Sequence, residues 1–157
     1  MSETTALQVR FPSDLVIVIT RDFKAPRRLV FETWTRPEHL RHWMGPRRWE
    51  MTVCEVDLRV GGTYHYVLHN AEGGEMELGG EFLEIVPPER IVSTEWFTEW
   101  PGCKLQDTVV LEERDGVTTM TATTLFDSAE MRAAWDGFEA GAAESFDRLD
   151  EVLATLV

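Results

Sequence analysis

The chain has 157 residues, of which 43% are hydrophobic and 27% are charged. This composition is that of a folded globular domain, and it excludes a disordered or collagen-like chain. No apolar run approaches the roughly eighteen residues that a membrane-spanning helix needs. The formal net charge of −13 disfavours nucleic acid and anionic membranes as partners, because an acidic surface repels phosphate groups.

Cysteine and histidine usage argues against a disulfide framework or a metal centre. Cys54 and Cys103 are the two cysteines, too few for either. His65 and His69 share one strand face but lie about 13 Å apart along it, too far for one ion.

The N-terminus MSETTALQ lacks the basic and apolar regions of a signal peptide. We therefore expect a cytoplasmic protein with no metal and no cofactor.

The N-terminal part predicts one strand followed by two short helices. A flexible leader is expected over residues 1–14, and the β-branched run from Leu15 to Thr20 predicts the first strand. Pro26 should lie in the first turn of the next helix, where its missing N–H costs nothing. A second short helix follows, capped by Thr35 and with Pro37 in its first turn.

The middle of the chain is strand-like almost throughout. Gly61 and Gly62 mark a hairpin turn, because glycine enters left-handed conformations freely. The other separators are equally short, so consecutive strands should pair antiparallel. The predicted strands span residues 50–58, 63–70, 75–86, 90–100, 104–114 and 117–125.

The last segment predicts one long amphipathic helix of about 26 residues, with apolar positions three and four apart. Asp127 should cap it, with Glu130 three residues further on. The elements together predict an α+β domain over residues 15–157. In this domain a curved seven-stranded antiparallel sheet wraps around the long C-terminal helix, and two short helices follow the first strand.

Four stretches spread over nearly the whole chain resemble one known protein family. They are APRRLVFETWTRPEHLRHWMGP at 25–46, DLRVGG at 57–62, GGEFLEIVPPERIV at 79–92 and GFEAGAAESFDRLDEVL at 137–153. In this order they resemble the proteins related to the activator of the 90-kDa heat-shock-protein ATPase, within the START/polyketide-cyclase-like (SRPBCC) superfamily. The resemblance implies a helix-grip fold, and members are mostly small-molecule binders, with cyclases and a co-chaperone domain among their relatives.

Two departures from the family pattern bear on function. Ala142 and Ala143 stand where the closing helix of the family usually has an aromatic residue, which would leave a roomier cavity. The co-chaperone relatives also carry a separate N-terminal chaperone-binding domain, for which the expected leader is too short. A chaperone-activating role, with its link to the stress response, is therefore the least favoured candidate.

Aromatic and methionine side chains predict a site for a small, hydrophobic ligand, aromatic or lipid-like, because such linings suit flat apolar molecules. The ligand should bind between the long helix and the sheet. The expected partners are this ligand and, in a homodimer, a second copy of the chain. The expected lining is Trp43 and Met44 at the mouth, Tyr64, Tyr66, Trp96 and Met120 on the sheet side, and Trp135, Phe138, Gly141 and Ser145 on the helix.

The strand around Trp96 leaves one alternative open. Its aromatic face, with Trp96, is expected to point inward, and its acidic face, with Glu95 and Glu99, to be exposed. Alternatively, a carboxyl group of this strand lies inside, where burial would raise its pKa and make it an acid or base. The rival function is accordingly a polyketide cyclase or dehydratase-like enzyme, for which the sequence assigns no catalytic residue.

Overall fold

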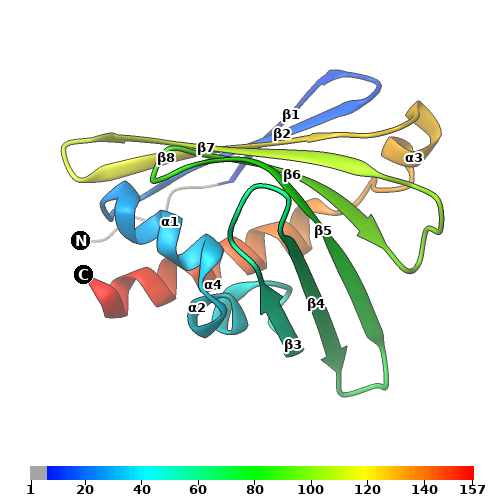
Figure 1. Cartoon of the computed structure of the whole chain (residues 1–157), viewed down its shortest axis with the longest axis horizontal. Coiled ribbons are helices and arrows are strands. Elements are labelled where there is room, and N and C mark those ends of the chain that lie inside the picture. The colour runs from blue at the N-terminus through cyan, green and yellow to red at the C-terminus, as the bar shows by residue number, and fades with distance from the viewer. Residues whose placement is uncertain (1–6) are drawn as a thin grey trace.

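The structure is a computed structural model that describes residues 7–157. One antiparallel sheet of eight strands curves over the helices, with the strand order β1-β2-β8-β7-β6-β5-β4-β3 (Figure 1). The strands are β1 (Gln8–Ser13), β2 (Val16–Phe23), β3 (Trp49–Val56), β4 (Thr63–Asn70), β5 (Glu75–Val86), β6 (Arg90–Phe97), β7 (Leu105–Arg114) and β8 (Val117–Leu125). The helices are α1 (Arg27–Thr35), α2 (Pro37–Trp43), α3 (Ala129–Ala133) and α4 (Glu139–Leu156).

The α+β architecture is confirmed, but the predicted number of strands was one too few. Gln8–Ser13 forms β1 and pairs antiparallel with β2, with Gln8 opposite Thr20. Most β1 side chains are exposed, so this strand lacks the apolar alternation that reveals a strand in sequence. The flexible leader predicted over 1–14 was therefore wrong for residues 8–13, and residues 1–6 lie outside the described part of the chain.

The two short helices are confirmed, while one of their predicted caps is wrong. Arg36 is the N-cap residue of α2, and Pro37 occupies its first position. The Thr35 hydroxyl donates instead to the backbone carbonyl of Phe31, at 2.9 Å. Thr35 ends α1, so its side chain satisfies a carbonyl of its own helix rather than an amide of the next.

The predicted single long helix is divided into α3 and α4. Gly137 separates them with a φ of 92°, a left-handed conformation that a helix cannot continue. The Ser128 hydroxyl caps α3 by accepting a hydrogen bond from the Met131 amide at 3.1 Å. The predicted cap, Asp127, accepts a hydrogen bond from the Lys104 amide at 2.8 Å, which ties α3 to the start of β7.

The interior between sheet and helices contains two apolar clusters, of which the first is closed. Phe146 of α4 lies at its centre, with ring centroids 6.5 Å from Phe23 of β2 and 5.9 Å from Trp43 of α2. Trp43 and Met120 are 1% and 0% exposed. We call this the closed cluster; α4 closes it by packing across α1 and α2 (Figure 1).

The second cluster lies around α3 and the turn between β6 and β7, at one end of the molecule (Figure 1). Buried Leu105 and Phe126 form its base. Trp100, Trp135 and Phe138 pack against that base and stay only partly buried. We call this the half-buried cluster. Phe97 of β6 contacts both clusters and connects them.

Candidate ligand-binding site

A row of polar side chains crosses the otherwise apolar inner face of the sheet. The β-sheet register places Ser93 of β6 opposite Asp107 of β7, and Asp107 opposite Thr124 of β8. Glu95 follows Ser93 on the same face of β6, because alternate residues of a strand share a face. We call the set Tyr64, Ser93, Glu95, Asp107 and Thr124 the inner polar row.

Hydrogen bonds connect the members of the row to one another and to the strands. The Thr124 hydroxyl donates to Oδ1 of Asp107 at 2.8 Å. The carboxyl groups of Glu95 and Asp107 are hydrogen-bonded to each other. The Tyr64 hydroxyl donates to the backbone carbonyl of Thr94 at 2.6 Å. The row is thus a fixed arrangement and not a set of independent side chains.

Gly80 of β5 makes room for the tyrosine in this row. It pairs with Tyr64 in the β4–β5 ladder. A Cβ atom at Gly80 would lie 2.8 Å from the Tyr64 hydroxyl and would collide with the carbonyl oxygen of Thr94. The absence of a side chain at this position therefore allows the tyrosine hydroxyl to reach the backbone of β6.

The carboxyl pair has an unusual protonation equilibrium. Burial raises the pKa of Glu95 well above its ordinary value, and the charge of Asp107 and the hydrogen bond to it raise it further. Burial also raises the pKa of Asp107, but hydrogen bonds from Glu95 and Thr124 oppose this. Glu95 therefore keeps its proton to a higher pH than an ordinary glutamate, and its O–H is the donor in the hydrogen bond to Asp107.

The two tyrosines of β4 stay neutral beside this pair. Burial is the main cause that raises the pKa of both Tyr64 and Tyr66, and the charge of Glu95 adds to it. Their rings lie 5.1 Å apart, and both residues are buried on the inner face, as predicted. They present phenol groups, not phenolates, to the interior.

The half-buried cluster contains a hydrogen-bond donor without a partner. The indole Nε1 of Trp135 is buried and has no hydrogen-bond partner among the described residues. Its ring lies 5.2 Å from Phe97, 5.7 Å from Trp100 and 5.6 Å from Phe126, measured between centroids. Because buried polar groups are nearly always hydrogen-bonded, this N–H is suited to an acceptor from water or a ligand.

The face assignment predicted for β6 was wrong. Glu95 and Phe97 point inward, whereas Trp96 lies on the outer face and is 39% exposed. The outer position is stabilised by Gly79, since a Cβ atom there would meet the Trp96 ring at 2.7 Å. Trp96 thus covers a glycine on the neighbouring strand, and the alternative with an inward-facing carboxyl group is the one the structure adopts, with Glu95 partly buried.

Three other residues predicted to line the ligand site belong to the closed cluster or pack against it. Trp43 is not at a mouth, because its Nε1 donates to the Thr33 carbonyl at 2.8 Å inside the core. Met120 of β8 is completely buried beside it. Met44 is partly buried against the same cluster. Trp43 and Met120 are thus enclosed by protein, whereas Met44 stays partly exposed.

The residues predicted on the helix wall divide between two places. Ser145 accepts a hydrogen bond from the Gly45 amide at 3.1 Å and donates to the Trp43 carbonyl at 3.2 Å. A Cβ atom at Gly141 would lie 3.4 Å from the Pro46 ring. Both positions therefore face the loop after α2 and not the sheet. Trp135 and Phe138 lie in the half-buried cluster.

Sequence reasoning assigned no role to Asp107 and left Glu95 open. Asp107 follows Leu105 and precedes Val109 and Leu111 at intervals of two, and these three neighbours are all buried. An acidic residue within an apolar alternation is the signal that would have placed it on the inner face. For Glu95 the register with β7 was needed, and short runs do not provide it.

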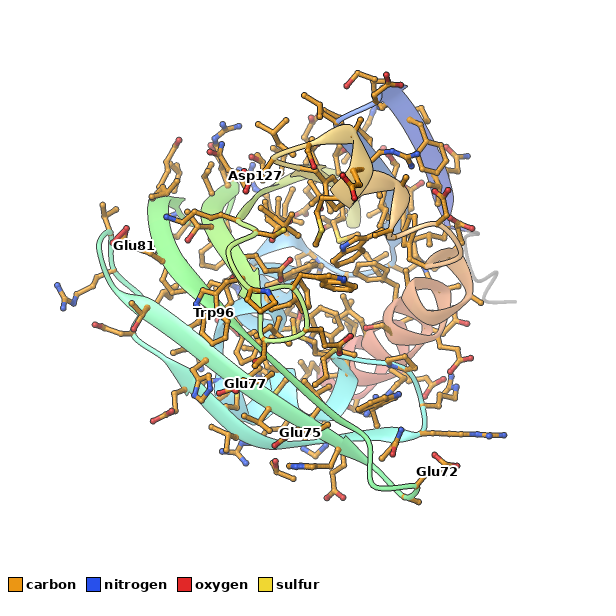
Figure 2. All side chains as sticks on the ribbon, turned by 90° about the vertical axis from the view of Figure 1, so that its right-hand side faces the viewer. Glu72, Glu75, Glu77, Glu81, Trp96 and Asp127 are labelled. Carbon is orange, nitrogen blue, oxygen red and sulfur yellow. The ribbon has the colours of Figure 1, made fainter. Side chains whose placement is uncertain are left out.

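The outer face of β3 to β6 presents a different, solvated set of charges. His65 contacts Glu55 through Nδ1 at 3.2 Å and Glu77 through Nε2 at 2.6 Å, and these bonds raise the pKa of the imidazole. Figure 2 shows Trp96 between Glu81 and Glu77 of the neighbouring strand β5. The Trp96 ring stacks on His65, with 6.1 Å between the ring centroids. A shallow depression of about 210 Å³ here is lined by Glu75, Glu77, Thr98 and Glu99.

Among residues 7–157, no three histidine, cysteine or acidic side chains form a group suited to a metal ion. Within the same range, no helix has the length and apolar character needed to cross a membrane.

A curved antiparallel sheet that closes on a C-terminal helix defines the helix-grip class of proteins. Within that class, the chain matches the family described as "Activator of Hsp90 ATPase homolog 1-like protein" over residues 24–154. The chain belongs to this family. No curated protein matches it in sequence.

Solved structures of similar proteins share the fold over nearly the whole chain. A Rhodobacter sphaeroides protein is 26% identical with a TM-score of 0.89, over 95% of this chain and 98% of its own. A Nitrosomonas europaea protein is 26% identical with a TM-score of 0.82, over 93% and 98%. The AHSA1 protein of Silicibacter pomeroyi, at 20% identity and a TM-score of 0.75 over 90% and 99%, shows the fold alone.

Proposed function

We propose that the protein binds a small, mostly apolar molecule on the inner face of the sheet, between the half-buried cluster and the inner polar row. The aromatic rings of Phe97, Trp100 and Trp135 supply apolar contact surface. Glu95, Asp107 and the Trp135 indole supply directional polar contacts. Apolar walls with a few fixed polar groups are the usual composition of a ligand site.

The observation that carries this proposal is the inward-facing Glu95–Asp107 pair, both members of which are partly buried. Burying two carboxyl groups costs stability, so a domain that needs only a core has no reason to retain them. Perturbed carboxyl groups inside a protein are concentrated at functional sites. Leu105 of the half-buried cluster pairs with Glu95 in the sheet register, so the carboxyl pair and the aromatic rings adjoin.

The test uses N-phenyl-1-naphthylamine, an uncharged apolar dye that fluoresces when it leaves water. We expect saturable binding with a stoichiometry of one, accompanied by quenching of indole emission. Trp135→Phe keeps the aromatic surface but removes the buried N–H. It should weaken binding about three- to tenfold for 6-propionyl-2-dimethylaminonaphthalene, an uncharged dye whose ketone oxygen is an acceptor. The matched control is Trp96→Phe on the outer face, which should leave binding unchanged.

Absence of saturable binding would refute the proposal, and so would an equal response of the Trp96 and Trp135 variants. Native mass spectrometry of the protein purified from its own host identifies the natural ligand by its mass. This second measurement does not depend on the choice of dye.

The carboxyl pair also favours a second candidate, an acid–base enzyme of the cyclase or dehydratase type. Glu95 would donate its proton to a carbonyl or hydroxyl oxygen while Asp107 accepts one from carbon, so the pair ends with the proton exchanged. Incubation with a poly-β-ketone thioester, followed by mass spectrometry for loss of one water, tests this. Glu95→Gln should abolish turnover while Glu112→Gln, on the outer face of β7, should not.

Activation of a chaperone ATPase is the third role that the family suggests. We expect no stimulation, because a net charge of −13 disfavours unspecific docking. A several-fold, dose-dependent rise in the ATPase rate of a 90-kDa heat-shock protein would contradict this expectation.

A further inference from the structure

The carboxyl pair is an acidic site inside the protein without a compensating cation. None of the ion pairs among the described residues includes Glu95 or Asp107. The buried Arg21 is not available to them, since its Nη1 binds Asp147 of α4 at 2.9 Å. The other groups that face the pair are uncharged, namely Thr124, Tyr64 and Tyr66.

We propose that the Glu95–Asp107 pair restricts the inner site to uncharged ligands that carry a hydrogen-bond acceptor, and excludes anionic analogues of the same size and shape. This inference rests on the proposed ligand-binding function and adds the chemical class of the ligand. Fatty acids and aromatic carboxylates are thereby excluded, whereas ketones, amides, esters and phenols are accepted.

The exclusion follows from desolvation and charge together. An anion that enters the inner site loses its hydration and meets no cation in return. It also meets a carboxyl pair that still carries one negative charge when Glu95 alone is protonated, and like charges repel strongly where water is scarce. Protonating Asp107 as well would remove the repulsion but would leave the bound anion without a cation to replace its lost hydration.

The preference for an acceptor follows from the indole of Trp135. Its Nε1 is a donor only, is buried, and has no partner among residues 7–157. A ligand with a carbonyl or ether oxygen satisfies this donor, while a pure hydrocarbon leaves it unpaired. Of two apolar ligands of equal size, the one with an acceptor should bind more tightly.

The decisive experiment compares 8-anilinonaphthalene-1-sulfonate with its uncharged sulfonamide, which has nearly the same bulk. Binding is measured by fluorescence at high salt, because salt screens the acidic surface but not a buried pair. We expect the sulfonamide to bind the unmodified protein at least about tenfold more tightly than the sulfonate, given the repulsion between like charges in a site of low polarity.

Substitutions then locate the source of the discrimination. Asp107→Asn removes the remaining negative charge and should reduce the affinity ratio to about threefold or less. Glu112→Gln removes a carboxylate from the outer face of the same strand and should leave the ratio unchanged. Circular dichroism verifies that each variant is folded. If Asp107→Asn does not fold, the ratio of sulfonamide to sulfonate affinity in the unmodified protein decides whether anions are excluded.

The outcomes separate the two proposals. Equal affinity for sulfonate and sulfonamide in the unmodified protein, or an unchanged ratio in folded Asp107→Asn, overturns the charge restriction and leaves ligand binding intact. If the sulfonate, the sulfonamide and N-phenyl-1-naphthylamine all fail to bind, the ligand-binding function is refuted. The charge restriction, which depends on that function, is then refuted as well.

Discussion

The closed and half-buried clusters are built from similar residues and differ in how completely their aromatic rings are buried. In the closed cluster, Trp43 is fully buried and its N–H is bound by Thr33. In the half-buried cluster, Trp135 stays partly exposed and its buried N–H has no partner among the described residues. Trp34, packed against the closed cluster, also has a buried N–H without a partner among the described residues. Neither aromatic content nor one unpaired indole therefore distinguishes a core from a binding site, and the degree of burial of the surrounding rings is the more useful difference.

The largest expected effect is on stability in the closed cluster. Trp43→Ala leaves a cavity and an unpaired carbonyl, and should lower the free energy of unfolding by about 3–5 kcal/mol. Trp135→Ala removes a half-buried ring and should cost about 2 kcal/mol. Urea denaturation measures both. Equal losses would mean that the two clusters are packed alike and that the comparison fails.

The next effect concerns the glycine under the inner polar row. Gly80→Ala introduces a Cβ atom against the Thr94 carbonyl and the Tyr64 hydroxyl, and both strands are fixed by their ladders. We expect a loss of about 1–3 kcal/mol or more, the usual cost of overpacking, together with weaker dye binding. A neutral effect in thermal unfolding would show that β5 and β6 can separate at this point.

The third prediction uses pH to probe the carboxyl pair. Glu95 has a raised pKa in the folded protein, so the folded state binds more protons than the unfolded state above the ordinary glutamate pKa of about 4.3. The contribution of Glu95 to stability should therefore be largest below that value and be lost as pH rises towards the folded pKa, with a slope of up to about 1.4 kcal/mol per pH unit for the proton retained. Glu77 and Glu151, whose pKa values are lowered, contribute with the opposite sign at low pH.

Glu95→Gln removes this dependence and should flatten the pH profile of unfolding, since Asp107 then lies beside a neutral amide. Glu112→Gln, on the exposed face of β7, is the control and should leave the slope unchanged. If stability depends on pH as steeply in Glu95→Gln as in the unmodified protein, the pH dependence arises from other titratable groups.

The smallest expected effect is at Gly141 of α4. A Cβ atom there meets only the Pro46 ring, at an ordinary contact distance of 3.4 Å. Gly141→Ala should stabilise the protein by about 0.5–1 kcal/mol through higher helix propensity. Dye binding should not change, because this position faces the loop after α2. Weaker dye binding in Gly141→Ala would show that Gly141 lines the ligand site after all.

The fold could be predicted from the sequence because its signals are local. The diglycine at Gly61 and the short turns fixed a series of antiparallel strands, and Pro37 marked the start of α2. The missed strand β1 is held by pairing with β2 and has little pattern of its own. The break at Gly137 was missed because apolar spacing of three and four continues across it.

The candidate site was harder to predict because it depends on strand register. Tyr64 and Tyr66 were placed correctly, since alternation after a clear turn fixes their face. Trp96 was placed inside because large aromatic residues are usually buried. In the structure one side of its ring instead packs on Gly79, which has no side chain, on the outer face. Because the face of this one strand was assigned wrongly, the predicted inner site contained the Trp96 indole where the structure has the Glu95 carboxyl group. The site was therefore expected to be apolar at a point where it is acidic.

The order of strands in the sheet also determines when the fold can form. β2 is completed early in the chain, but its ladder partner β8 follows about a hundred residues later, with Val16 opposite Leu125. Such distant pairing closes a long loop, and domains dominated by it fold in milliseconds to seconds instead of microseconds. During synthesis, β2 therefore has an unpaired edge towards β8 until β8 has left the ribosome, and only then can α4 close over the sheet.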